Sequence, residues 1–162
     1  MKKILMLAVV SIVVISAGFF AFIKTNPPLA AGSLSASGDY HTVVAVVGND
    51  GWSDVKITSV SVNNNEQPQK QKMQVSNPHL GFVITDTFDE ETEEYGIQNV
   101  EEVTILPGTE PSAQLEKLNN GTSTEDDESY GLTVVHNEPV HTVELTYRYL
   151  GFSFEKTIET NI

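Results

Sequence analysis

An acidic stretch between Asp86 and Gly96 has the strongest chemical character in this sequence. It reads DTFDEETEEYG and contains six carboxylates and no basic residue. Calcium takes about six to eight oxygen ligands from a tightly folded loop, in which Asp or Asn alternates with other residues and a glycine makes the turn. This stretch has neither that spacing nor that glycine, so it matches no specific calcium loop. Three interpretations stay open: a solvated loop, a docking surface for a basic partner, and a weak calcium site.

A second acidic patch, EDDE at positions 125–128, lies in a turn-rich segment and has the same irregular spacing. The turn GNDGWSD adds the only tryptophan of the chain, which either anchors a partner or packs against the end of the domain. The candidate calcium ligands are Asp86, Asp89, Glu90, Asp126 and Asp127. The candidate contacts for a protein partner are Trp52, Glu91, Glu93 and Glu94.

Two histidines, His136 and His141, flank a turn at Asn137–Pro139. If the flanking strands form a hairpin, the two rings face each other with Glu138 nearby, and His/His/carboxylate is a chemically reasonable zinc set. The alternative is that both are polar residues at strand ends.

The sequence offers no recognisable catalytic machinery. There is no cysteine, no Gly-x-Ser-x-Gly elbow, no phosphate-binding or dinucleotide-binding glycine loop and no His-Glu-x-x-His. We therefore expect no catalytic residues, no cofactor and no enzymatic activity.

The first segment of the chain is unlike the rest. Residues 4–23 carry no charge, and as a helix they would span about 30 Å, the thickness of the hydrocarbon core of a bilayer. We expect an uncleaved transmembrane anchor here. The alternatives are a cleaved signal peptide, for which Leu29–Gly32 (LAAG) offers a distant cleavage site, and a buried core helix.

Charge predicts the orientation of this anchor and the partners of the domain. Lys2 and Lys3 precede the apolar run and Lys24 follows it, so the positive-inside rule places the N-terminus in the cytoplasm. Beyond residue 24 the chain has 22 acidic and six basic residues, a net charge of −16. Such a surface disfavours nucleic acid and anionic lipid as partners and allows cations and basic proteins.

The elements that must position these side chains are strands. A period of two in residues 142–149 and 152–159, joined by Leu150-Gly151, predicts a long hairpin. In 55–62 the apolar residues change phase, which predicts a bulge near Thr58-Ser59. Further strands are expected at 40–47, 72–75, 81–85, 100–106 and 131–136, with one or two helical turns at 112–118.

Seven or eight short strands separated by turns predict an all-β fold, namely an antiparallel immunoglobulin-like β-sandwich preceded by one transmembrane helix. A small barrel is the alternative. We expect an anchor at 1–24, a Pro/Ala/Ser-rich linker at 25–38 and an extracytoplasmic domain at 39–162. Asp50-Gly51 is expected to supply the positive φ of a tight turn.

The basic start and anchor, the Pro/Ala/Ser linker, the opening NDGWSDVKITSV and the closing YRYLGF resemble the small membrane-anchored immunoglobulin-like proteins of Gram-positive bacteria. The resemblance covers residues 40–62 and 140–158. It implies an extracytoplasmic sandwich and no catalytic residues.

Together these features predict a non-catalytic domain anchored in the cell membrane through residues 4–23, which acts as an interaction or accessory module at the cell surface. The alternative is a weak cation-binding or ligand-binding sensor that uses the acidic loops 86–96 and 125–128. The domain would be secreted if the N-terminal segment is cleaved.

Overall fold

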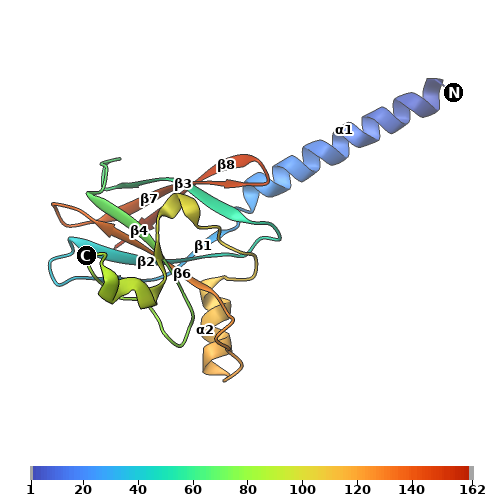
Figure 1. Ribbon diagram of the computed structural model, residues 1–162. Helices are drawn as coiled ribbons and strands as arrows, with labels where there is room; N and C mark the ends of the chain where they lie inside the picture. Colours follow the sequence, from blue (N-terminus) through green and yellow to red (C-terminus); the bar gives the residue numbers. More distant parts are fainter. Residues whose placement is uncertain (1, 161–162) are drawn as a thin grey trace.

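A long N-terminal helix leads directly into a β-rich domain in the computed structural model (Figure 1). The structure describes residues 2–160, apart from the side chains of Leu5, Ala8, Glu90, Glu91 and Glu93. The helices are α1 (Lys2–Thr25) and α2 (Pro111–Asn119), with 3-10 turns η1 (Glu90–Tyr95) and η2 (Val100–Glu102). The strands are β1 (Leu29–Ala36), β2 (Thr42–Asn49), β3 (Val55–Val62), β4 (Lys70–Ser76), β5 (Ile97–Gln98), β6 (Ser129–Val135), β7 (Thr142–Tyr149) and β8 (Phe152–Glu159).

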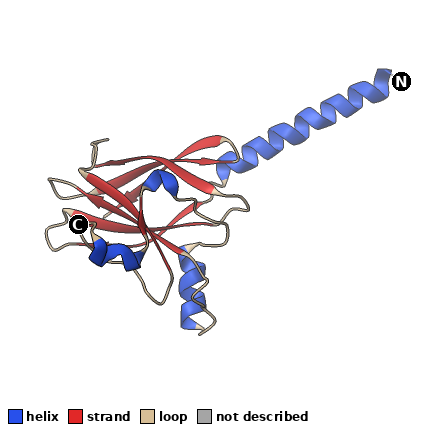
Figure 2. Ribbon diagram, in the orientation of Figure 1, coloured by secondary structure: helices blue, strands red, loops and turns tan. Residues whose placement is uncertain are grey.

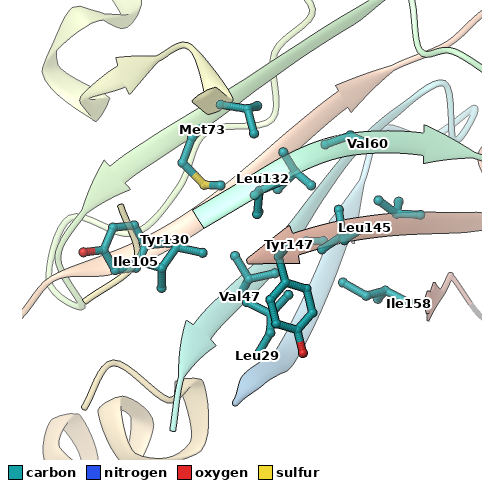
Figure 3. Packing of buried hydrophobic residues seen from close by; sticks show 14 of the residues in the cluster. Leu29, Val47, Val60, Met73, Ile105, Tyr130, Leu132, Leu145, Tyr147 and Ile158 are labelled. Carbon is teal, nitrogen blue, oxygen red and sulfur yellow. The ribbon is translucent and has the colours of Figure 1, made fainter. Parts of the chain in front are cut away.

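These strands form two antiparallel sheets, as Figure 2 shows in red. The larger sheet has the order β1-β2-β6-β4-β5, and the smaller one has the order β3-β7-β8. Both sheets contribute to one hydrophobic core, in which Val47 and Leu132 of the larger sheet lie near Leu145 and Tyr147 of the smaller one (Figure 3). The prediction of an antiparallel, mostly β domain after one apolar helix is therefore confirmed.

The C-terminal hairpin has the register that its alternating sequence predicts. Thr142 pairs with Glu159, and Tyr149 pairs with Phe152. Leu150 (φ 50°) and Gly151 (φ 81°) both lie in the left-handed region, which is the geometry of a tight two-residue hairpin turn. The alternation buries one side chain in two along β7, so this hairpin forms one layer of the core.

The predicted bulge in β3 is confirmed. The pairing of β3 with β7 shifts by one residue between Ile57 and Ser59, which leaves Thr58 as the extra residue. Val60 and Ile57 are therefore both buried although their spacing is odd. The bulge keeps the apolar residues on the core face across the change of phase.

The expected linker at 25–38 is largely a strand. Leu29–Ala36 form β1, which pairs with β2 at the edge of the larger sheet. Leu29 is buried and Leu34 packs against the core, so these two side chains give the segment an apolar face. The small residues between Leu29 and Leu34 are typical of a flexible linker. They are equally compatible with an edge strand that lies close to another segment, as Gly32 lies close to Pro111.

Two other expected strands have a different structure. Residues 81–85 form a loop. The backbone of Val83 forms its hydrogen bonds with the side chain of Gln74 and not with the backbone of a neighbouring strand. Its N–H donates to Gln74 Oε1 (2.9 Å), and its carbonyl accepts from Gln74 Nε2 (2.7 Å). The 100–106 segment forms η2 and then a single bridge from Ile105 to Val55. The helical turns expected at 112–118 are confirmed as α2.

The prediction of a positive φ at Gly51 is wrong. The reason is that β2 and β3 belong to different sheets, so their connection is no tight hairpin. This glycine is needed because its backbone lies close to Tyr149 and Pro28. A Cβ at position 51 would lie 2.8 Å from both Tyr149 Oη and Pro28 Cβ. The glycine lets the loop lie against the end of β7.

Two glycines, Gly48 of β2 and Gly131 of β6, leave the outer face of the larger sheet without side chains at their positions. Gly131 pairs with Val46 on the neighbouring strand. A Cβ on Gly48 would lie 2.0 Å from the carbonyl oxygen of Thr109 and 2.8 Å from Pro111 Cδ, while one on Gly131 would lie 2.6 Å from the Phe82 ring. The segment before α2 and the 81–85 loop therefore lie directly on the sheet because these positions have no side chain.

Replacing Gly48 by Ala should destabilise the domain by about 2 kcal/mol, because the backbone of Thr109 must move away. For a chain of this size we expect the thermal unfolding midpoint to fall by about 4–8 °C. Gly38→Ala is the matched control, since a Cβ there meets nothing within 4 Å, and it should leave the midpoint unchanged. Equal midpoints for the two variants would contradict the packing described here.

Candidate functional site

Trp52 lies at the junction between α1 and the domain. Its ring stacks on Phe22 (centroids 6.2 Å apart, 18° between planes), and Phe19 and Tyr149 complete the group at 6.5 and 5.9 Å. The backbone N–H of Trp52 donates to Tyr149 Oη at 3.2 Å. The side chain nevertheless remains 58% exposed. Trp52 therefore joins the helix to the domain and also presents part of its indole to the surroundings.

The last turn of α1 makes further contacts with the domain. Ile23 is 1% exposed and belongs to the hydrophobic core. Lys24 Nζ donates to the carbonyl of Ser153 (3.1 Å) and lies 4.8 Å from the centroid of the Phe154 ring. The end of the helix lies near the β7–β8 hairpin (Figure 1). One buried side chain, one cation and several rings hold it there.

We name the group of Phe19, Phe22, Ile23, Lys24, Trp52 and Tyr149 the aromatic junction. Aromatic rings and a lysine at the end of an apolar helix are the side chains that favour the boundary between hydrocarbon and water. The sequence pattern singles out Trp52 but not its neighbours. The signal was present, because Phe19, Phe20 and Phe22 cluster at the end of the apolar run.

Removing the indole should loosen the helix from the domain. The chain has no cysteine, so spin labels at Val10→Cys on α1 and Lys56→Cys on β3 report their separation directly. We expect a narrow distance distribution in the parent chain, a broad one after Trp52→Ala and a narrow one after Trp52→Phe, which keeps a ring. A narrow distribution after Trp52→Ala would show that Ile23 and Lys24 hold the helix without Trp52.

The first acidic stretch lies in the loop before η1 and in η1 itself. The carbonyl of Asp86 accepts a hydrogen bond from Lys70 Nζ at 2.7 Å. Asp86, Asp89 and Glu94 are exposed. The candidate side chains of Glu90, Glu91 and Glu93 lie outside the described part of the structure.

The second acidic patch contains a structural carboxylate. Asp127 Oδ1 accepts from Lys117 Nζ (2.6 Å), and Oδ2 accepts from the backbone N–H of Thr124 (2.8 Å). The hydrogen bond from Lys117, followed by that from Thr124, lowers the pKa of Asp127 from 3.8 to about 2. This carboxylate closes the loop after α2, whereas the candidate Asp126 beside it is exposed.

Because its pKa is lower in the folded chain, Asp127 stabilises the fold above its ordinary pKa of 3.8, and this contribution is lost as the pH falls towards 2. We expect Asp127→Asn to lower the unfolding midpoint by a few degrees at pH 7. The difference from the parent chain should shrink as the pH is lowered from about 5 towards 2. Asp126→Asn is the control. An equal loss of stability in Asp126→Asn, or a pH-independent loss in Asp127→Asn, would contradict the role assigned to Asp127.

The candidate zinc set of His136, His141 and Glu138 is not assembled. His136 follows β6 and His141 precedes β7, which belong to different sheets, so the turn between them is a crossover and no hairpin. His136 Nε2 instead lies 3.1 Å from Glu66 Oε2, and the backbone N–H of His141 donates to Asn63. Among the described side chains of residues 2–160, no group of three His, Asp or Glu residues could hold a metal ion.

A polar cavity of about 430 Å³, which no sequence pattern indicates, is lined by Asp86 together with Asp39, His41 and His136. Asp39 accepts a hydrogen bond from Ser37 Oγ (2.6 Å), and this bond lowers its pKa below the ordinary range. The buried Nδ1 of His136 has no partner among the described groups. Two carboxylates and no lysine or arginine are among the described residues that line the cavity, so it suits small solutes that donate hydrogen bonds or carry positive charge.

Comparison of the chain with protein-family models, with curated proteins and with solved structures finds no match. The features of this structure that bear on its function are therefore the aromatic junction, the acidic loops and the cavities.

Proposed function

We propose that this chain is a single-span membrane protein. Residues 4–23 cross the bilayer, the N-terminus is cytoplasmic, and the β domain is extracytoplasmic. The domain is a non-catalytic interaction or accessory module of the cell surface, and its two sheets form an immunoglobulin-like sandwich. This sandwich would match the small membrane-anchored proteins of Gram-positive bacteria that the sequence resembles.

The observation that carries the proposal is the bare apolar surface of α1. The helix has a mean hydropathy of 2.7 in its most apolar window, and none of that window is buried. Ile4, Ile15 and Phe22 are all more than half exposed, so a buried core helix is a poor alternative. Water penalises a helix that is apolar on every side, whereas hydrocarbon does not. By length and composition the helix suits a bilayer span.

The aromatic junction supports an uncleaved anchor that holds the domain at the membrane surface. Only Asn26, Pro27 and Pro28 separate α1 from β1, so the domain cannot move far from the end of the helix. Cleavage at Leu29–Gly32 would cut β1 and remove the buried Leu29 from the core. An uncleaved anchor therefore agrees better with the fold than a secreted form does.

Charge supports the interaction role. Asp86, Glu94 and Asp126 are exposed and would be repelled by an anionic bilayer surface, which leaves them available to a basic partner in solution or on the cell surface. The second candidate function is weak binding of cations or small ligands. The cavity that joins Asp86 to Asp39 favours it, because two carboxylates there face a common space.

Because the chain has no cysteine, single introduced cysteines can report the membrane topology and the protein partner in one experiment. Single variants Lys3→Cys, Glu94→Cys and Lys56→Cys are expressed in intact cells and treated with a membrane-impermeant maleimide that carries a photo-crosslinker. We expect labelling at 94 and 56 in intact cells, and at position 3 only after permeabilisation. We also expect crosslinks to a defined protein from position 94 and few from position 56.

Labelling of position 3 in intact cells would overturn the orientation. Recovery of a labelled chain whose N-terminus lies within Leu29–Gly32 would replace the anchor by a cleaved signal. Labelling at 94 with no crosslinked protein would remove the partner role of the first acidic loop and favour the small-ligand candidate.

A further inference from the structure

A groove of about 450 Å³ crosses the outer face of the larger sheet. Its floor contains Val46 and Gly32, and its two walls are α2 and the segment 77–82. The groove exists because Pro111 packs above Gly32 and Gly48 while Phe82 packs above Gly131, so two covering elements lie on the sheet with a gap between them. Its size falls in the range of small-molecule sites.

The helix that forms one wall has an unfilled apolar stripe. Pro111, Gln114, Leu115 and Leu118 line the groove at the spacing of one helical face. Leu115 is 57% exposed and Leu118 is 38% exposed, although such a face is normally buried on a sheet. With Phe82 and Pro78 opposite, the walls are mostly apolar.

One polar group beside the groove lacks its partner. Gln114 is 6% exposed, and its Nε2 donates to the carbonyl of Gly108 at 3.2 Å. Its Oε1 is buried and accepts no hydrogen bond from any described group. A buried acceptor without a donor is unfavourable, so a ligand that supplies a donor would remove this penalty.

The remaining polar groups of the groove indicate which sign of charge its ligand should carry. Glu110 lines the groove, and one of its carboxylate oxygens accepts from Ser112 Oγ at 2.6 Å. Asn77 Oδ1 is already occupied by the N–H groups of His79 and Leu80. No lysine or arginine is among the described residues that line the groove. Acceptors and a carboxylate beside apolar walls, on a domain of charge −16, favour a positively charged ligand.

We infer that this groove binds a small amphiphilic cation, with its apolar body between Leu115, Leu118 and Phe82 and its ammonium group towards Glu110 and Gln114. The floor is the face of the sheet, where side chains and not backbone groups are presented, so the site suits a small molecule better than an added strand. The inference does not depend on the membrane topology proposed above.

The test uses the full chain in lipid nanodiscs with leucine and valine methyl groups labelled for NMR. The probe is 2-phenylethylammonium, and 3-phenylpropionate is its matched anion with a similar apolar body. We expect saturable shifts of the Val46, Leu115 and Leu118 methyl signals with a Kd below about 1 mM for the cation. The anion should bind at least about tenfold more weakly, and empty nanodiscs correct for partitioning into lipid.

Two variants locate the site. Val46→Trp fills the floor and should abolish the shifts of the two leucines, whereas Leu106→Trp at an exposed position outside the groove should leave them unchanged. Glu110→Gln should weaken the cation at least about threefold and leave the anion unaffected or strengthened.

Equal affinity for cation and anion would overturn the charge assignment. Absence of saturable shifts from the cation up to 5 mM, or shifts that persist in a folded Val46→Trp chain, would overturn the site itself. The methyl spectrum of each variant shows whether it is folded, so a misfolded variant cannot be mistaken for loss of binding.

Discussion

One constraint determines much of the rest of the structure: the apolar helix α1 leads into a folded domain with no flexible linker between them. Three residues separate α1 from β1, and Ile23 of the helix is already part of the domain core. The hydrophobic surface of α1 is unfavourable in water. The aromatic junction holds the domain at the end of this helix, so the environment of the helix also fixes where the domain lies. The position of the β7–β8 hairpin, the edge strand β1 and Trp52 relative to the helix all follow from it.

The outer face of the larger sheet obeys a second constraint, which is close approach. Glycines at positions 48 and 131 let Pro111 and Phe82 lie on the sheet, and buried Asn49 fixes the same region by donating to the carbonyls of Ser53 and Ile105. The two covering regions meet at one end, where His79 Nε2 lies 3.3 Å from the carbonyl oxygen of Ser123 after α2. The groove beside α2 is the space that this packing leaves.

The acidic surface is divided between structural and free carboxylates. Asp127 and Asp39 accept hydrogen bonds that hold their own loops, and both have lowered pKa values for that reason. Asp86, Glu94 and Asp126 are exposed. The donors to Asp39 and the Thr124 donor to Asp127 are local, whereas Lys117 reaches Asp127 from α2, so the spacing of acidic residues alone does not separate these groups.

The sequence by itself determined the apolar helix, the long hairpin, the β3 bulge and α2, because each depends on local periodicity and turn chemistry. Only the tertiary structure decided that 29–36 is an edge strand, that His136 and His141 lie in different sheets and that Gln74 holds Val83. It also decided that Trp52 meets Phe22 and that α2 leaves a groove. These features depend on contacts between distant segments, and strand order across two sheets is not encoded in any local pattern.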